Sequence, residues 1–281
     1  MCVKFQVLSR FTTSRGNDCI KGRGATNNEV NSLMTSIRKR ERLTIGISGL
    51  DAMLGGGLLQ GSAILVSGAP GVGKTTLGLQ YLVTGASLGQ PGLLVTFEEF
   101  PATLIRDAES MGWDLRALEA EGMLRLLFTS PEVFVTSLES PDSPLSETIR
   151  TIAPQRAVID SMAHFQRLTS DRVELRHTYN SMVNGLKREG MTGLLLDEAS
   201  RLLGAQYRYA GALPFLADAL ILMRYVEVDS AMQRAIAVLK MRGSTHAREI
   251  RSFSIGKNGI EVGEPFSGQE GILSGSPHRV A

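Results

Sequence analysis

Short apolar runs alternate with longer segments of helical periodicity along the middle of the chain. The apolar runs are rich in Leu, Val and Ile, which is typical of strands buried on both faces. We predict strands at residues 63–67, 93–97, 123–128, 157–160 and 193–196. We predict helices at residues 76–83, 101–111, 145–152 and 174–189, and a loop at 129–144. Strands separated by helices favour a mainly parallel sheet.

The pattern changes after residue 219. Strand-like runs at 219–226, 234–241, 252–255 and 260–262 follow one another closely, and Lys257-Asn258-Gly259 has the composition of a turn. Strands with such short connections favour antiparallel pairing. With no internal repeat, the chain is predicted to form one α/β domain, whose mainly parallel sheet gains antiparallel strands towards the C-terminus.

A glycine-rich motif lies between the first predicted strand and the first predicted helix. Residues 68–75 read Gly-Ala-Pro-Gly-Val-Gly-Lys-Thr, which is G-x-x-x-x-G-K-T. In a phosphate-binding loop the backbone N–H groups surround the β-phosphate, and the helix N-terminus adds its positive end. Lys74 would reach the β- and γ-phosphates, and the Thr75 hydroxyl would ligate Mg²⁺. A chance glycine-rich turn is the alternative, but it is rarer between a strand and a helix. We therefore predict binding of a nucleoside triphosphate.

Acidic residues follow two of the predicted strands. Asp160 ends an apolar run, where a carboxylate could hold the hydration shell of Mg²⁺ opposite Thr75. Glu98 and Glu99 directly follow the strand at 93–97, where a carboxylate could orient or deprotonate an attacking water molecule. Solvated surface is the alternative for adjacent glutamates, and the phosphate-loop motif upstream favours catalysis.

Composition is that of an ordinary globular protein, with 43% hydrophobic and 21% charged residues among 281. The longest apolar stretch, residues 212–223, contains Asp218 and is too short for a membrane span. The two cysteines, Cys2 and Cys19, offer the body of the chain no disulfide framework, which suits a reducing cytoplasm. The four histidines show no metal-ligand spacing.

Residues 1–42 form a basic segment with a net charge of +6, so the remaining 239 residues carry −4. The segment is polar and has little periodicity, and we expect a mobile tail. Its basic run, residues 38–42, could contact nucleic acid or an acidic partner, although solvation is the more common role of such a run. Translation could also begin at Met34.

Several separated stretches of the chain carry a family resemblance. Residues 49–58 look like the entry segment of RecA-type ATPases, and Phe97-Glu98-Glu99-Phe100-Pro101 resembles the double-glutamate motif of the KaiC family, the circadian-clock branch of that superfamily. Residues 111–115, 239–246 and 274–279 look like further stretches of that family. The resemblance runs collinearly from about residue 43 to the C-terminus. It implies a RecA-like P-loop core at residues 43–281 in a single-domain relative.

The resemblance also implies a hexameric ring in the cytoplasm, with ATP and Mg²⁺ between neighbouring subunits. Lys240 and Arg242 match a pair that reaches the neighbour's nucleotide as an arginine finger does, and His246 falls where the family contacts nucleotide from the adjacent subunit. A charged edge strand is the alternative for Lys240 and Arg242. The residues implied to hold the triphosphate are Gly68, Gly71, Val72, Gly73, Lys74, Thr75 and Thr76.

The chain departs from the family where the clock protein's second domain carries its autophosphorylated serine and threonine. Pro214 and Phe215 occupy these positions, and neither has a hydroxyl. We therefore expect ATP hydrolysis coupled to signalling with a protein partner. The alternatives are a DNA-binding repair or recombination ATPase and a protein autokinase. A body at −4 offers little attraction for nucleic acid, so only the tail could supply it.

Overall fold

A nine-stranded sheet forms the centre of the part of the chain that the structure describes. The computed structural model describes residues 41–198, 213–267, 269–274 and 278–279. The strand order is β11-β10-β9-β8-β3-β7-β6-β4-β5. The strands are β3 (Ala63–Gly68), β4 (Gly92–Thr96), β5 (Leu124–Phe128), β6 (Arg156–Asp160), β7 (Thr192–Glu198), β8 (Ala219–Val228), β9 (Ala231–Met241), β10 (Ile250–Gly256) and β11 (Gly259–Pro265).

The sheet divides into a parallel part and an antiparallel part. The strands from β5 to β8 in this order pair in parallel, and β8, β9, β10 and β11 pair antiparallel. Both parts of the predicted fold are therefore confirmed. Two small sheets add β1 (Arg42–Leu43) with β2 (Leu58–Leu59), and β12 (Gln269–Glu270) with β13 (His278–Arg279).

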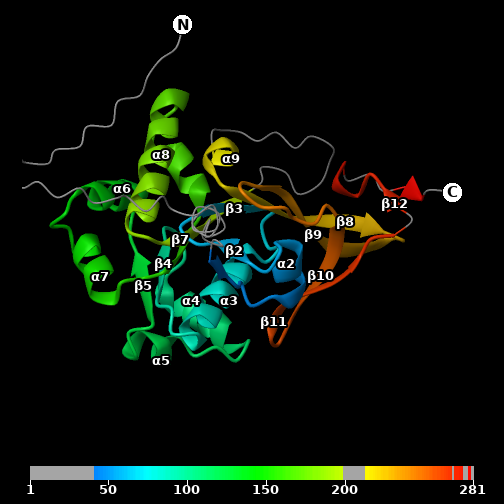
Figure 1. The fold of residues 1–281 in the computed structure, drawn as a ribbon, viewed down its shortest axis with the longest axis horizontal. Helices are drawn as coiled ribbons and strands as arrows, with labels where there is room; N and C mark the ends of the chain where they lie inside the picture. The colour runs from blue at the N-terminus through cyan, green and yellow to red at the C-terminus, as the bar shows by residue number, and fades with distance from the viewer. Residues whose placement is uncertain (1–40, 199–212, 268, 275–277, 280–281) are drawn as a thin grey trace, which may run out of the picture. The chain divides into compact units, whose positions relative to one another are not determined.

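Helices cover both faces of the sheet, as Figure 1 shows for α3 and α4 against α6 and α8. On one face lie α2 (Ser48–Met53), α3 (Lys74–Ser87), α4 (Pro101–Glu109) and α5 (Leu115–Ala120). On the other lie α6 (Pro131–Glu139), α7 (Pro144–Ile152), α8 (Arg172–Arg188), α9 (Leu213–Leu216) and the 3₁₀ helix η1 (Met162–Arg167). A second 3₁₀ helix, η2 (Ile272–Ser274), follows β12. The central strands β3 and β4 and the first five residues of β7 are buried on both faces, which accounts for their nearly continuous apolar sequence.

The prediction of a loop at residues 129–144 is wrong for Pro131–Glu139, which form α6. The Ser130 side chain accepts a hydrogen bond from the Val133 N–H, and Pro131 occupies the first turn, so the helix has a regular N-terminus. Phe134 and Leu138 lie four residues apart and are both buried. The prolines and serines of this segment therefore begin helices. The short helices α2 and α5 were also not predicted.

Four parallel strands end at one edge of the sheet. Gly68 of β3 is the register partner of Glu198 of β7, and Thr96 of β4 is the partner of Asp160 of β6. The carboxyl ends of parallel strands are where open α/β sheets bind ligands. The fold therefore assembles the predicted phosphate loop and the predicted acidic residues at the same edge.

The basic N-terminal segment lies outside the described residues up to residue 40. Arg42 forms part of β1, and its guanidinium donates to the carbonyls of Leu54 and Gly57. The tail boundary at residue 42 stays a prediction. Among the described residues, none of the helices is both long and apolar enough to cross a membrane.

Candidate nucleotide site

A cavity of about 450 Å³ opens at the carboxyl ends of β3, β4, β6 and β7. Its lining combines the phosphate loop with acidic residues from three strand ends. The lining residues are Pro70, Gly71, Gly73, Lys74, Thr75, Thr76, Thr96, Glu98, Glu99, Asp160, Ser161, His164, Glu198 and Ile255. The phosphate loop and all three predicted carboxylates thus meet at one hollow, although they are spread over almost a hundred residues of sequence.

The loop is shaped by glycines that no other residue could replace without displacement. Gly73 has φ 112°, and a Cβ there would lie 2.5 Å from the Ile255 Cδ1 atom. A Cβ at Gly68 would lie 2.6 Å from the Met223 carbonyl oxygen. Val72 is fully buried, and its side chain fixes the loop to the core rather than facing a ligand.

A tyrosine from the neighbouring strand holds the top of the loop. The Tyr225 hydroxyl of β8 donates to the Gly71 carbonyl over 2.7 Å. No pattern in the sequence predicts this contact, because β8 lies beside β3 only through the strand order. Gly71 and Tyr225 are 154 residues apart in the chain.

Lys74 begins α3 and is 7% exposed. Its Nζ donates to the carbonyls of Gly68 and Ala69, each over 3.0 Å, so the ammonium lies within the curve of the loop. Burial lowers the pKa of Lys74, while the carboxylates of Glu198 and Asp160 act in the opposite direction. An anionic ligand would supply the charge partner that this buried cation otherwise draws from the strand ends.

Thr75 and Asp160 are hydrogen-bonded to each other beside Lys74 and would together offer two oxygen ligands to a metal ion. The Thr75 hydroxyl donates to Asp160 Oδ2 over 2.7 Å. Burial raises the pKa of Asp160, and the Thr75 hydrogen bond and the Lys74 charge oppose this shift. Within the described residues no group of three or more His, Cys, Asp or Glu side chains could hold a metal ion. A hydroxyl with one carboxylate fits Mg²⁺, which takes its remaining ligands from phosphates and water.

The two predicted glutamates differ in their surroundings. Glu98 Oε2 lies 3.0 Å from His164 Nε2, whereas burial, followed by the nearby Asp160 carboxylate, raises the pKa of Glu99. The backbone at Glu99 is held by the buried Thr96 side chain, whose hydroxyl donates to the Glu99 carbonyl. His164 was not among the predicted site residues, although it follows Asp160 by four positions.

A third acidic strand end was missed. Glu198 lines the cavity, and its neighbour Asp197 has one oxygen, Oδ1, that is buried without a hydrogen-bond partner among the described residues. Burial raises the pKa of Asp197 to about 6. Both acids end an apolar run, as Asp160 does, so the same sequence signal was present.

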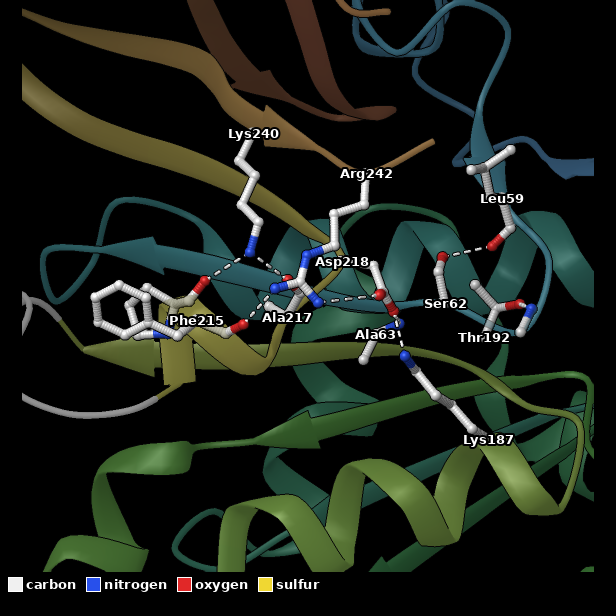
Figure 2. A network of polar contacts seen from close by, with 12 residues as sticks. Leu59, Ser62, Ala63, Lys187, Thr192, Phe215, Ala217, Asp218, Lys240 and Arg242 are labelled. Atoms are coloured by element: carbon white, nitrogen blue, oxygen red, sulfur yellow. Dashed lines mark hydrogen bonds and ion pairs between the residues drawn. The ribbon is translucent and has the colours of Figure 1, made fainter. Parts of the chain in front are cut away.

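Lys240 and Arg242 lie at the opposite end of the sheet. Figure 2 shows both side chains directed at α9, where Lys240 Nζ donates to the Pro214 and Ala217 carbonyls over 2.9 and 2.6 Å. Arg242 donates to the Phe215 carbonyl over 2.7 Å and lies 3.9 Å from Asp218. Lys240 pairs in register with Leu220, near the start of β8, whereas the phosphate loop follows the end of β3. Neither residue lines the cavity of its own chain.

His246 also lies outside the cavity lining. Its Nδ1 is 2.8 Å from the Ala247 carbonyl, in the segment that follows β9. The structure therefore brings together the predicted residues of the phosphate loop, the metal pair and the glutamates, and leaves Lys240, Arg242 and His246 apart from them.

Comparison with known proteins agrees with this geometry. A family model described as "ATPase: KaiC" matches residues 43–267. The circadian clock protein KaiC3 of Synechocystis sp. is 36% identical over 236 residues, which cover 84% of this chain and 46% of that protein. The circadian clock oscillator protein KaiC of Thermostichus vulcanus is 35% identical over 248 residues, which cover 88% of this chain and 47% of that protein. The chain thus spans about half the length of these relatives. The phosphate loop and the paired glutamates lie within the matched region, and the chain belongs to the KaiC family of ATPases.

Proposed function

We propose that this protein binds ATP with Mg²⁺ and hydrolyses the γ-phosphate in the cavity at the end of β3. The observation that carries the proposal is the 2.7 Å contact between the Thr75 hydroxyl and Asp160, beside the buried ammonium of Lys74. Membership of an ATPase family supports it. The chain also contains a carboxylate pair, Glu98 and Glu99, at the rim of the same cavity.

Each group has a defined part in this reaction. Lys74 and the backbone N–H groups of the loop bind the phosphates. Thr75 and Asp160 would hold Mg²⁺, which neutralises charge on the phosphate oxygens when bound. Glu98 and Glu99 orient the attacking water molecule and can accept its proton.

The proposal includes assembly into a ring, and the position of Lys240 and Arg242 supports it. Because these cations lie at the far end of the sheet from their own phosphate loop, they can reach a γ-phosphate only in another copy. Contacts that join one end of a subunit to the other end of the next are heterologous, and they form a ring when the rotation between neighbours closes. We propose a hexamer in the cytoplasm, as the family resemblance implies, with hydrolysis coupled to a protein partner.

The alternatives receive less support. Autophosphorylation at the family's position lacks a nucleophile, because Pro214 and Phe215 have no hydroxyl and only their carbonyls contact Lys240 and Arg242. The nearest other hydroxyls, Tyr207 and Tyr209, lie outside the described residues. DNA binding by the body is disfavoured by the net charge of −4 outside residues 1–42.

Molar mass and phosphate release, measured on the same samples, test the proposal. Wild type should release phosphate only with Mg²⁺, and light scattering should show a several-fold larger mass with ATP than without it. Lys74→Ala should neither release phosphate nor form the larger species with ATP. A monomer with ATP would overturn the ring, and γ-label retained stoichiometrically on the protein would favour the autokinase. Absence of hydrolysis by the wild type would overturn the ATPase itself.

A further inference from the structure

We propose that His164 is a positioning residue for hydrolysis, which holds the Glu98 carboxylate at the rim of the cavity through its Nε2–H. The inference rests on the proposed ATPase function and names a group that the phosphate-loop and double-glutamate motifs do not contain. It is carried by one contact, by the burial of the imidazole and by the packing beneath it.

The contact joins a fixed donor to a mobile acceptor. His164 Nε2 lies 3.0 Å from Glu98 Oε2, and both side chains line the cavity. The His164 side chain is only 13% exposed, whereas that of Glu98 is 75% exposed. A carboxylate can only accept a hydrogen bond, so Nε2 carries the proton. A glutamate so exposed would otherwise sample many rotamers, and the imidazole restricts them.

The imidazole is itself held by an aromatic cluster. His164 lies in η1, whose Met162 and Phe165 are fully buried, and the Tyr179 hydroxyl of α8 donates to the Met162 carbonyl. The Phe97 ring packs edge-on against Phe165 with centroids 5.2 Å apart, and it lies 6.2 Å from the His164 ring. Phe97 directly precedes Glu98, so the same packing fixes the donor and the backbone of the acceptor.

This arrangement follows the logic of a base and its orienting group. The His164 contact uses Oε2, so Oε1 is left to accept from a water molecule in the cavity. Most exposed ion pairs contribute little, because two mobile side chains must be ordered for a screened attraction. Here only the glutamate has to be ordered, since the histidine is already buried. The contact can therefore direct the carboxylate at a small cost.

Four variants measured by steady-state phosphate release test the proposal: His164→Ala, His164→Gln, Glu98→Gln and the Glu98→Gln, His164→Ala double variant. Removing the donor should lower kcat roughly three- to tenfold and change the KM for ATP by less than about twofold, because it misplaces a group that acts on the nucleophile. Gln places an amide N–H near the position of Nε2 and should recover most of kcat. In the Glu98→Gln background, His164→Ala should have no further effect.

His177→Ala is the matched control, because His177 is an exposed histidine of α8 outside the cavity lining and should leave kcat unchanged. If His164→Ala lowers the melting temperature markedly, His164→Gln and His164→Asn are compared, since both keep an amide and only Gln reaches Glu98. Unchanged kcat in His164→Ala, an equal loss in the Glu98→Gln background, or equal kcat for Gln and Asn would each overturn the proposal. An inactive wild type would instead overturn the ATPase function.

Discussion

The two ends of the parallel strands carry polar clusters of opposite character. At the carboxyl end, Lys74, Asp160 and Asp197 are buried or nearly so. Burial lowers the pKa of the lysine and raises the pKa of both aspartates, so it favours the neutral form of each. At the amino end, Asp218 accepts from the Ala63 N–H over 2.9 Å and pairs with Lys187 over 2.5 Å. The carboxyl-end cluster surrounds a cavity, whereas the amino-end cluster closes on the backbone of α9, as Figure 2 shows.

The carboxyl-end cluster is therefore suited to binding a ligand, whereas the amino-end cluster joins structural elements to one another. Buried charges that lack full compensation are costly in a folded protein and cluster where a charged ligand completes them. The amino-end cations have carbonyl and carboxylate partners within their own chain. A role for Lys240 and Arg242 in phosphate chemistry therefore requires that these partners be exchanged for those of a neighbouring copy.

The largest expected effect is at Lys74. Lys74→Ala removes the buried ammonium that would meet the phosphates, and we expect ATP affinity to fall by about 100-fold or more. Lys187→Ala is the control from the amino-end cluster, since it also removes a lysine paired near the sheet, and it should leave the affinity unchanged. Isothermal titration with Mg²⁺ and a non-hydrolysable ATP analogue measures both. Equal losses would mean that the two clusters do not differ in function.

The second effect separates binding from chemistry. Replacing Glu98 and Glu99 together by Gln keeps the size of the side chains and removes both carboxylates that face the nucleophile. Hydrolysis should fall by roughly 100-fold, with ATP affinity changed less than about threefold. Phosphate release and titration on one preparation provide the comparison. Hydrolysis at the wild-type rate would remove the glutamates from the proposed mechanism.

A smaller effect concerns stability and pH. The pKa of Asp197 is raised from 3.8 to about 6, so between these values the folded protein holds a proton that the unfolded chain has released. Stability from this group therefore falls as pH rises through the window, and the ionised carboxylate costs about 3 kcal/mol at neutral pH. Asp197→Asn should raise the free energy of unfolding by about that amount at pH 7 and by almost nothing at pH 4.

Urea unfolding of wild type and Asp197→Asn at both pH values measures this difference. Glu189→Gln serves as a control, because Glu189 is a surface carboxylate that follows α8 and pairs with Arg188 at 3.7 Å. A gain from Asp197→Asn that is the same at pH 4 and pH 7 would show that burial of the charge is not its cause.

The sequence predicted the parts of the site that are local in the chain. The phosphate loop is one contiguous motif, and Asp160 and the two glutamates each end an apolar run, so their strand ends could be inferred. Glu198 ends such a run as well, but only the position of β7 beside β3 brings it to the cavity. Strand order depends on which elements pack together in the folded chain, and hydrophobic periodicity does not predict it.

Two further residues show the same limit. Tyr225 reaches Gly71 because β8 is the other neighbour of β3. His164 contacts Glu98 because Phe97 and Phe165, which come from separate segments, pack together beside its ring. The buried Arg156 is the opposite case, a charge with a purely structural role. Its guanidinium lies over the Tyr81 ring and donates to the Tyr81 and Thr44 carbonyls. Nothing in the order of residues distinguishes such a cation from a ligand-binding one.

The most direct test of the account is complementation between the two ends of the sheet. Arg242→Ala subunits retain the cavity groups, and Glu98→Gln, Glu99→Gln subunits retain Arg242. Each should be nearly inactive alone. In an equal mixture that light scattering shows to co-assemble, competent interfaces form at random, and activity should recover to at most about a quarter of the wild-type rate. Co-assembled mixtures with no recovery, or full activity of Arg242→Ala alone, would contradict a site completed by the neighbouring copy.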